Sequence, residues 1–323
     1  MHAIQVRRTG GPEVLEYREI AEPIPGKGEA LVRLSAIGVN FIDIYYRRGV
    51  YQMEVPFTPG EEGAGIVERI GPGADFVKPG DRVAFTSVPR AYAEKIVVSA
   101  DRLVKLPESV GFNEGAAAML QGITAHYLTT TTYPIGKGDT VLVHAAAGGV
   151  GLLLVQLAKF RGATVIGTVS TEEKASLAAD AGADHTILYT RTDFQKAVRE
   201  ITGGRGVQAV YDSVGNDTFD RSLSCLAPRG YLVSFGQSSG KVQPLDIYRL
   251  SAGGSLFVTR PTIGHYIATR EELLARAGEL LGWVAEGRLS LRIGAIHPLA
   301  EAARAHELIE SRKTTGKVLL VPA

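Results

Sequence analysis

The sequence predicts an α/β protein with two parts, a partly open β-barrel and a doubly wound parallel sheet. Short strands separated by Gly/Pro turns fill residues 1 to about 119, as in a small barrel. From residue 140 onward, apolar strands alternate with segments of helix length. The length of 323 residues allows two domains at about 100–200 residues each.

The barrel part is predicted from a series of short apolar runs. The expected strands cover residues 1–6, 30–37, 64–70, 81–85 and 91–98. Turns such as Gly71-Pro72-Gly73 and Lys78-Pro79-Gly80 separate them. Because Gly and Pro interrupt strands at this spacing, a compact, partly open β-barrel is expected.

The second part predicts six strands with helices between them. The expected strands are residues 140–144, 164–169, 185–188, 207–212, 231–235 and 255–259. The expected helices are residues 150–160, 172–181, 193–201, 218–226 and 245–250. Continuous apolar strands indicate a parallel sheet covered on both faces, and six of them suit a doubly wound fold.

The last stretch of the chain changes pattern again. Residues 270–286 and 301–311 are expected to form helices, and residues 316–321 a final strand. We expect that strand to return to the N-terminal barrel.

Composition excludes several classes of protein. Lys and Arg number 35 against 34 Asp and Glu, which disfavours nucleic acid or an anionic membrane as the main partner. Cys225 is the single cysteine, so no disulfide, Cys-based zinc site or iron–sulfur cluster forms within one chain. The N-terminus has no signal-peptide pattern, and no apolar run reaches about 18 residues. A cytoplasmic location is therefore expected.

The most informative segment is the small-residue turn after the strand at 140–144. Aligned to the dinucleotide fingerprint G-x-G-x-x-G, it has Ala146, Gly148 and Gly151, so Ala replaces the first Gly. Small residues let backbone N–H groups approach a pyrophosphate at the start of the following helix. The strand before and the helix after this turn predict a dinucleotide site.

The end of the next strand bears on the choice of nucleotide. An NAD site usually places Asp or Glu there, at the ribose 2′-hydroxyl. Here the strand ends in Val169-Ser170-Thr171, and Lys174 follows. A cation without a carboxylate suits the 2′-phosphate of NADPH, whereas Glu172 or Glu173 turned inward favours NADH.

With their surroundings, these residues resemble the medium-chain dehydrogenase/reductase superfamily, and within it the zinc-free quinone oxidoreductase (zeta-crystallin-like) branch. The matching segments cover nearly the whole chain: residues 10–15, 38–43, 60–65, 121–125, 144–151, 211–215 and 233–236. The resemblance implies a GroES-like catalytic domain at residues 1–120 and 263–323. It implies a Rossmann NADPH-binding domain at residues 121–262, with the cofactor in the cleft.

The resemblance also bears on zinc. Alcohol dehydrogenase relatives carry Gly-His-Glu with a zinc-binding His, and Glu61 takes the place of that His here. We expect Cys225 in a Rossmann helix, far from any such site. Without zinc as a Lewis acid, the hydride acceptor should be a quinone or an activated enone.

The resemblance assigns roles to individual residues. Asn40, Tyr45 and Tyr51 are implied to line the nicotinamide and acceptor pocket and to stabilise the oxygen that becomes anionic. Tyr51 donates a proton in this scheme, or the reduced quinone takes it from water. The residues implied to bind the cofactor are Asn40, Thr124, Gly148, Gly149, Val150, Lys174, Tyr189, Gly236, Gln237, Phe257, Val258 and Arg312.

The predicted function is NADPH-dependent, zinc-independent reduction of a quinone. The alternatives are an enone or enoyl-thioester reductase on the same scaffold, and an NADPH-sensitive RNA-binding protein, which the near-zero charge disfavours. The resemblance implies a homodimer formed through the last Rossmann strand, residues 255–259, since an edge strand can pair with a second copy.

Overall fold

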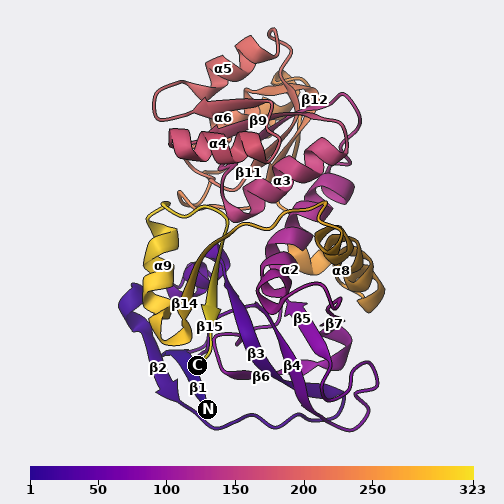
Figure 1. Ribbon diagram of the computed structural model, residues 1–323. Helices are drawn as coiled ribbons and strands as arrows, with labels where there is room; N and C mark the ends of the chain where they lie inside the picture. Colours follow the sequence, from indigo (N-terminus) through magenta and orange to yellow (C-terminus); the bar gives the residue numbers. More distant parts are fainter. The chain divides into compact units, whose positions relative to one another are not determined.

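The computed structural model describes all residues, Met1–Ala323, which form two compact units. The first unit, here called the barrel unit, comprises Met1–Ile123 and Tyr266–Ala323. The second, here called the Rossmann unit, comprises Thr124–His265. The chain therefore leaves the barrel unit once and returns to it (Figure 1).

The barrel unit contains a seven-stranded sheet and a separate hairpin. The hairpin pairs β1 (His2–Val6) with β2 (Leu15–Glu19). The sheet has the order β14-β15-β3-β4-β5-β7, with β6 also paired to β3. Its strands are β3 (Glu29–Val39), β4 (Glu62–Ile70), β5 (Arg82–Thr86), β6 (Lys95–Ser99), β7 (Val104–Lys105), β14 (Ile293–Pro298) and β15 (Lys317–Val321).

Strand β3 is the centre of this sheet. It pairs antiparallel with β4, β6 and β15, and its apolar side chains, among them Leu31 and Ile37, are buried. The pairing of Val318 with Val39 confirms that the last strand returns to the N-terminal part. The helices of this unit are α1 (Phe41–Arg47), most of α2 (Phe112–Tyr127), α8 (Arg270–Ala285) and α9 (Ala302–Glu310).

The Rossmann unit is built on a six-stranded parallel sheet with the order β10-β9-β8-β11-β12-β13. The strands are β8 (Thr140–Val143), β9 (Thr164–Val169), β10 (His185–Leu188), β11 (Val207–Asp212), β12 (Leu226–Ser234) and β13 (Phe257–Thr259). Numbered within the unit, this order is 3-2-1-4-5-6, which is that of a dinucleotide-binding fold. The predicted doubly wound sheet is confirmed.

Helices surround this sheet (Figure 1). They are α3 (Gly149–Phe160), α4 (Glu172–Asp180), α5 (Phe194–Ile201), α6 (Phe219–Leu223) and α7 (Tyr248–Ala252). Strand residues such as Leu142, Ile166 and Val210 are fully buried, as expected for strands covered on both faces.

Two expectations about the Rossmann elements are wrong. Cys225 lies after α6 and before β12 rather than in a helix, although it is fully buried. The carbonyl of Cys225 accepts the N–H of Val207 at 2.9 Å, and Leu226 pairs with that residue, so the chain joins the sheet early. The helix expected at 245–250 begins at Tyr248, whose N–H donates to the Asp246 carboxylate at 3.0 Å.

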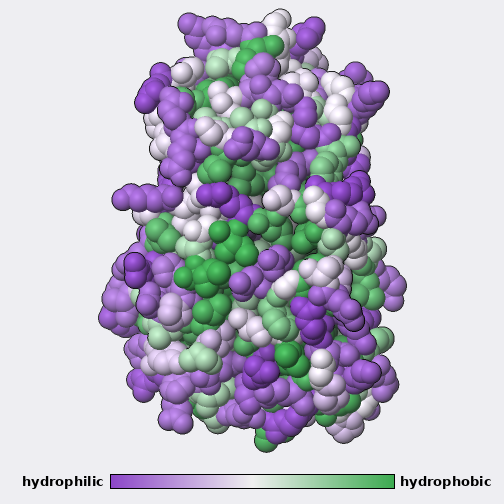
Figure 2. Space-filling model, in the orientation of Figure 1, coloured by the Kyte–Doolittle hydropathy of each residue, from purple (hydrophilic) through white to green (hydrophobic).

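None of the helices combines the length and the apolar composition that crossing a membrane requires. Hydrophilic residues are spread over the visible face of both units, with apolar patches among them (Figure 2).

Candidate active site

The turn between β8 and α3 has a backbone shaped for an anion. Ala145 adopts a left-handed conformation, with φ of 51°, and its carbonyl accepts the N–H of Gly148 at 2.9 Å. Helix α3 then begins at Gly149, and its N-cap residue, Gly148, supplies no side-chain acceptor. The first N–H groups of a helix have no acceptor within the helix, so those of α3 are available to a phosphate.

Close packing explains why this turn tolerates Ala in place of the first Gly of the fingerprint. A Cβ on Gly167 of β9 would lie 2.7 Å from the Cβ of Ala146, so Gly167 leaves the space that Ala146 fills. A Cβ on Gly151 would lie 2.9 Å from the Cα of Ala146 and closer still to the Ala145 carbonyl oxygen. The residues present therefore fit a dinucleotide pyrophosphate.

A buried polar chain, which the sequence analysis missed, fixes the ends of β8, β9 and β11. His144 lies 2.9 Å from both Thr168 Oγ1 and Ser222 Oγ, and Ser222 donates to Asp212 at 3.1 Å. Because Ser222 donates to the carboxylate, His144 Nε2 carries the proton and Nδ1 accepts from Thr168. Burial lowers the pKa of His144, which keeps the ring neutral. The position of a His at a strand end was the only signal in the sequence.

The loop after β12 is held by an arginine that the sequence analysis also missed. Arg260 donates to the Gly236 carbonyl at 2.8 Å and to Gln237 Oε1 at 3.3 Å. A Cβ on Gly236 would lie 2.6 Å from the carbonyl oxygen of Ser213, in the loop after β11. The close approach of the two loops therefore requires glycine at position 236. Both loops follow the carboxyl ends of strands, where ligands of such sheets bind.

Lys174 and Tyr189 follow neighbouring strands, β9 and β10. Lys174 is half-buried in the first turn of α4, and burial lowers the pKa of its ammonium group. Tyr189 is exposed, and its N–H donates to the Val169 carbonyl at 3.1 Å. Glu172, one of the two carboxylates that favour NADH in the alternative interpretation, forms an ion pair with Arg191 at 2.8 Å.

The remaining predicted cofactor residues lie in different places. Phe257 and Val258 are in the edge strand β13, where the Phe257 ring stacks on Tyr231 at 4.5 Å. Thr124 is buried in α2. Arg312 belongs to the barrel unit, is exposed, and adopts a left-handed backbone with φ of 56° between α9 and β15.

In the barrel unit, Asn40 directly precedes α1 and is buried. Its Nδ2 donates to Glu62 Oε1 at 2.7 Å, and its Oδ1 accepts from Lys317 Nζ at 2.8 Å and from Gln121 Nε2 at 3.3 Å. The amide of Asn40 is therefore held from both ends.

The structure brings the two predicted tyrosines together. The rings of Tyr45 and Tyr51 meet edge to face at 73°, with centroids 5.4 Å apart, and the ring of Tyr46 lies 5.8 Å from that of Tyr51. The N–H of Tyr51 donates to the Tyr45 carbonyl at 3.3 Å. Helix α1 and the loop after it thus place Asn40, Tyr45 and Tyr51 in one short segment.

A second buried chain supports α1. The Tyr92 hydroxyl donates to Asp43 Oδ2 at 3.0 Å and lies 3.0 Å from His306 Nε2. Arg47 Nη1 lies 3.1 Å from His306 Nδ1, and its Nη2 lies 2.8 and 2.9 Å from the two carboxylate oxygens of Glu310. Because guanidinium only donates, His306 accepts at Nδ1 and donates from Nε2.

The charges around this chain shift several pKa values. Burial raises the pKa of Asp43 to about 8, and the Glu61 carboxylate adds to the shift. Burial and the Arg47 charge lower the pKa of His306 to about 3. Burial also raises the pKa of Glu61, and it raises that of its hydrogen-bond partner Tyr46 to about 12.

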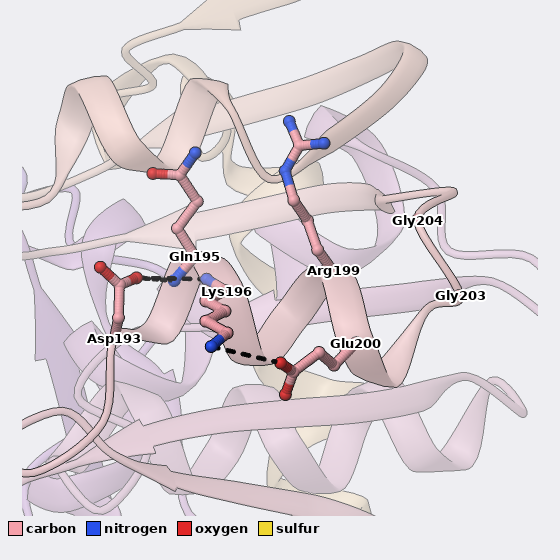
Figure 3. A pocket seen from close by; sticks show the side chains of 7 residues that line it. All are labelled: Asp193, Gln195, Lys196, Arg199, Glu200, Gly203 and Gly204. Carbon is pink, nitrogen blue, oxygen red and sulfur yellow. Dashed lines mark hydrogen bonds and ion pairs between the residues drawn. The ribbon is translucent and has the colours of Figure 1, made fainter.

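The structure contains no group of three or more His, Cys, Asp or Glu side chains that is arranged to hold a metal ion. A shallow hollow along α5 contains none of the predicted site residues (Figure 3). It is lined by Asp193, Gln195, Lys196, Arg199, Glu200, Gly203 and Gly204.

Comparison with known proteins identifies both parts of the chain. Residues 26–132 match the model of the alcohol dehydrogenase GroES-like domain, and residues 149–278 match the model of the zinc-binding dehydrogenase domain. A quinone oxidoreductase of Pseudomonas aeruginosa is 49% identical over 321 residues, 99% of each chain. A 2-haloacrylate reductase of Burkholderia is 42% identical over 328 residues, 99% of this chain and 98% of the relative.

Solved structures agree with this assignment. The crystal structure of Escherichia coli quinone oxidoreductase complexed with NADPH has a TM-score of 0.98 against this chain, with 44% identity and complete coverage of both chains. A mycobacterial protein complexed with NADPH has a TM-score of 0.96, 49% identity and complete coverage of both chains. This chain belongs to the zinc-free quinone oxidoreductase family of the medium-chain dehydrogenase/reductase superfamily.

Proposed function

We propose that this protein is an NADPH-dependent quinone reductase that needs no zinc. The observation that carries the proposal is the turn of residues 145–151. Gly151 in this turn and Gly167 in the neighbouring strand β9 leave space for a backbone that meets a pyrophosphate. Full-length identity of 45–49% to bacterial quinone oxidoreductases supports the choice of acceptor.

In this proposal the Rossmann unit binds the cofactor through backbone groups. The N–H groups of Gly149 and Val150 hold the pyrophosphate at the start of α3, and Gly148, whose own N–H donates to the Ala145 carbonyl, lets the backbone approach it. NADPH, when bound, supplies a hydride. The family resemblance assigns Phe257 and Val258 to the nicotinamide carboxamide through their backbone groups. It places Thr124, Gly236 and Gln237 beside the cofactor.

In this proposal the preference for NADPH over NADH comes from Lys174, Arg312 and the phenol of Tyr189, which bind the 2′-phosphate. Lys174 and Tyr189 follow adjacent strands, so both can reach one adenosine 2′-phosphate. The ion pair of Glu172 with Arg191 supports this choice, because it engages one of the two carboxylates, Glu172 and Glu173, that would favour NADH. Arg312 is assigned to the same phosphate by family resemblance.

Asn40, Tyr45 and Tyr51 are assigned to the acceptor. Amide and phenol donors stabilise the quinone oxygen on which negative charge develops, and they orient the ring for attack. The one proton that, with the hydride, completes the hydroquinone comes from Tyr51 or from water. The two tyrosine rings pack against each other, which limits their motion.

Steady-state oxidation of NADPH and of NADH by the purified protein tests the proposal, with benzoquinones and naphthoquinones as acceptors. We expect turnover with quinones and a lower KM for NADPH than for NADH. Lys174→Ala should raise the KM for NADPH and leave that for NADH unchanged, because NADH has no 2′-phosphate. Lys196→Ala, on the exposed face of α5, is the matched control. Equal KM values in the wild-type enzyme would refute the 2′-phosphate assignment.

A second candidate activity is reduction of an activated enone. The 42% identity to a 2-haloacrylate reductase favours it. That reaction needs a proton at carbon, so Tyr51→Phe should lose turnover of 2-haloacrylates and related enones while keeping quinone turnover. Equal losses with both acceptors would remove the case for a separate enone activity.

We also propose a cytoplasmic homodimer that pairs through β13, with the catalytic domain at residues 1–120 and 263–323 and the NADPH domain at 121–262. Strand β13 lies at the edge of the six-stranded sheet, and 48% of the Phe257 surface is exposed there. Sedimentation should give twice the chain mass of 34.4 kDa. A monomer would refute the dimer.

A further inference from the structure

We propose that Lys317 is a positioning residue that, with Glu62, orients the Asn40 amide for the reaction. The proposal deepens the function above and rests on it, because it gives Asn40 its role at the acceptor. No motif in the sequence predicts such a role for Lys317 or Glu62.

The three side chains form one buried cluster. Lys317 Nζ donates to Asn40 Oδ1 at 2.8 Å and to Glu62 Oε1, and Asn40 Nδ2 donates to that same carboxylate oxygen at 2.7 Å. The side chains of Lys317 and Glu62 are 2% and 0% exposed. The other carboxylate oxygen of Glu62 accepts the N–H of Leu120 at 2.6 Å, so the carboxylate itself is fixed.

The chemistry of the partners determines which way the amide points. An ammonium group only donates, so Lys317 selects the oxygen of Asn40, and a carboxylate only accepts, so Glu62 selects the nitrogen. If the amide were turned over, Asn40 Nδ2 would lie against the Lys317 ammonium group and Oδ1 against the Glu62 carboxylate, and neither pair could form a hydrogen bond. Nδ2 carries two hydrogens, and the contact with Glu62 uses one of them. The second remains for the acceptor.

The sheet brings these residues together from distant parts of the chain. Strand β3 pairs with β15 on one side and with β4 on the other, and Asn40 comes directly after β3. Lys317 is the first residue of β15, and Glu62 is the first residue of β4. A Cβ on Gly38 would lie 2.6 Å from Glu62 Cγ, so the missing side chain at Gly38 makes room for the carboxylate.

Because both ionic side chains are enclosed, they act through Asn40 rather than on the substrate. Their removal should therefore change activity only while Asn40 is present. A residue that merely stabilised the fold would lower activity in any background. This difference separates positioning from structural support.

A double-mutant cycle in the full-length enzyme tests the proposal. Lys317→Met combined with Glu62→Gln removes both charges together, which avoids a lone buried charge. The kcat with NADPH and 1,4-benzoquinone should fall at least tenfold, with the Kd for NADPH unchanged. In an Asn40→Ala background the same pair of changes should alter kcat less than twofold. Lys95→Met with Glu68→Gln, which removes an ion pair of the same sheet, should leave kcat within twofold.

If the neutral pair fails to fold, Lys317→Arg gives the same comparison with the charge retained. It should lower kcat several-fold with Asn40 present and have no effect with Asn40→Ala. Equal losses in both backgrounds, or an unchanged kcat with Asn40 present, would overturn the positioning role while quinone reduction stands. A wild-type enzyme that oxidises no NADPH with quinones would overturn the proposed function, and the positioning role with it.

Discussion

Asp43 provides a prediction that can be worked out from its surroundings. The carboxyl group is fully buried and receives two hydrogen bonds, both at Oδ2: 3.0 Å from the Tyr92 hydroxyl and 2.8 Å from the Asn40 N–H. Its Oδ1 has no hydrogen-bond partner. Because two donors do not offset the loss of water, burial raises the pKa of Asp43 from 3.8 to about 8. We expect this carboxyl to be neutral at pH 7.

Such a shift makes stability fall as pH rises. Between pH 3.8 and about 8 the folded protein keeps a proton on Asp43 that the unfolded chain has lost. The stabilising contribution is therefore complete below pH 3.8 and is lost as the pH rises through about 8. Integrating this proton difference from about pH 6.5 to 8 gives a loss of about 1.6 kcal/mol in the free energy of unfolding.

His306 changes stability in the opposite direction. Its pKa falls from 6.5 to about 3, so its contribution is present above pH 6.5 and is lost as the pH falls towards 3. Below pH 6.5 the pH dependences of stability that come from Asp43 and His306 have opposite signs. Above pH 6.5 the dependence that comes from Asp43 remains. Between pH 6.5 and 8 the remaining titration of His306 in the unfolded chain contributes only about 0.4 kcal/mol, so Asp43 dominates this interval.

Asp43→Asn is the perturbation, with the wild-type protein as reference. The difference in free energy of unfolding between the two proteins should shift by about 1.6 kcal/mol from about pH 6.5 to 8, with the wild type losing stability. Denaturant unfolding measures this shift. Infrared spectra should show a neutral carboxyl band at pH 6.5 that is absent in Asp43→Asn. Parallel pH profiles together with no such band would refute the reasoning.

Three other changes test the packing around the site. Gly151→Ala should weaken NADPH binding more than tenfold in calorimetric titration, because the added Cβ would meet the backbone of Ala146; unchanged affinity would contradict the close approach. Arg260→Leu should raise the KM for NADPH with little change in Tm, since it frees the Gly236 loop; a KM equal to that of the wild type would assign Arg260 no part in binding. Arg47→Leu should lower stability by about 3–5 kcal/mol, because it leaves Glu310 without its buried partner. Arg48→Leu, at an exposed position, should lower the free energy of unfolding by less than about 1 kcal/mol. Equal losses of stability for Arg47→Leu and Arg48→Leu in calorimetric unfolding would contradict the argument.

The fold was predictable wherever local pattern determined the structure. The alternation of strands and helices predicts the six-stranded sheet, and the pairing of β15 with β3 confirms the predicted return of the last strand to the barrel. Boundaries were less accurate where tertiary pairing overrides local pattern. Cys225 is an example, because pairing of Leu226 with Val207 ends α6 early.

The candidate site was only partly predictable. Ala146 was recognised as a variant of the fingerprint, but the reason it is tolerated lies in Gly167, on another strand. The cluster of Asn40, Glu62 and Lys317 joins residues up to 277 positions apart. No periodicity connects such positions, so side-chain contacts at this separation required the folded chain.

The most direct test of the central claim is the stoichiometry of quinone reduction under anaerobic conditions. NADPH consumption is followed by absorbance while 1,4-benzoquinone and hydroquinone are separated by chromatography. We predict one hydroquinone formed for each NADPH oxidised, with no added metal. No hydroquinone above the enzyme-free control would contradict the assignment of this chain as an NADPH-dependent quinone reductase.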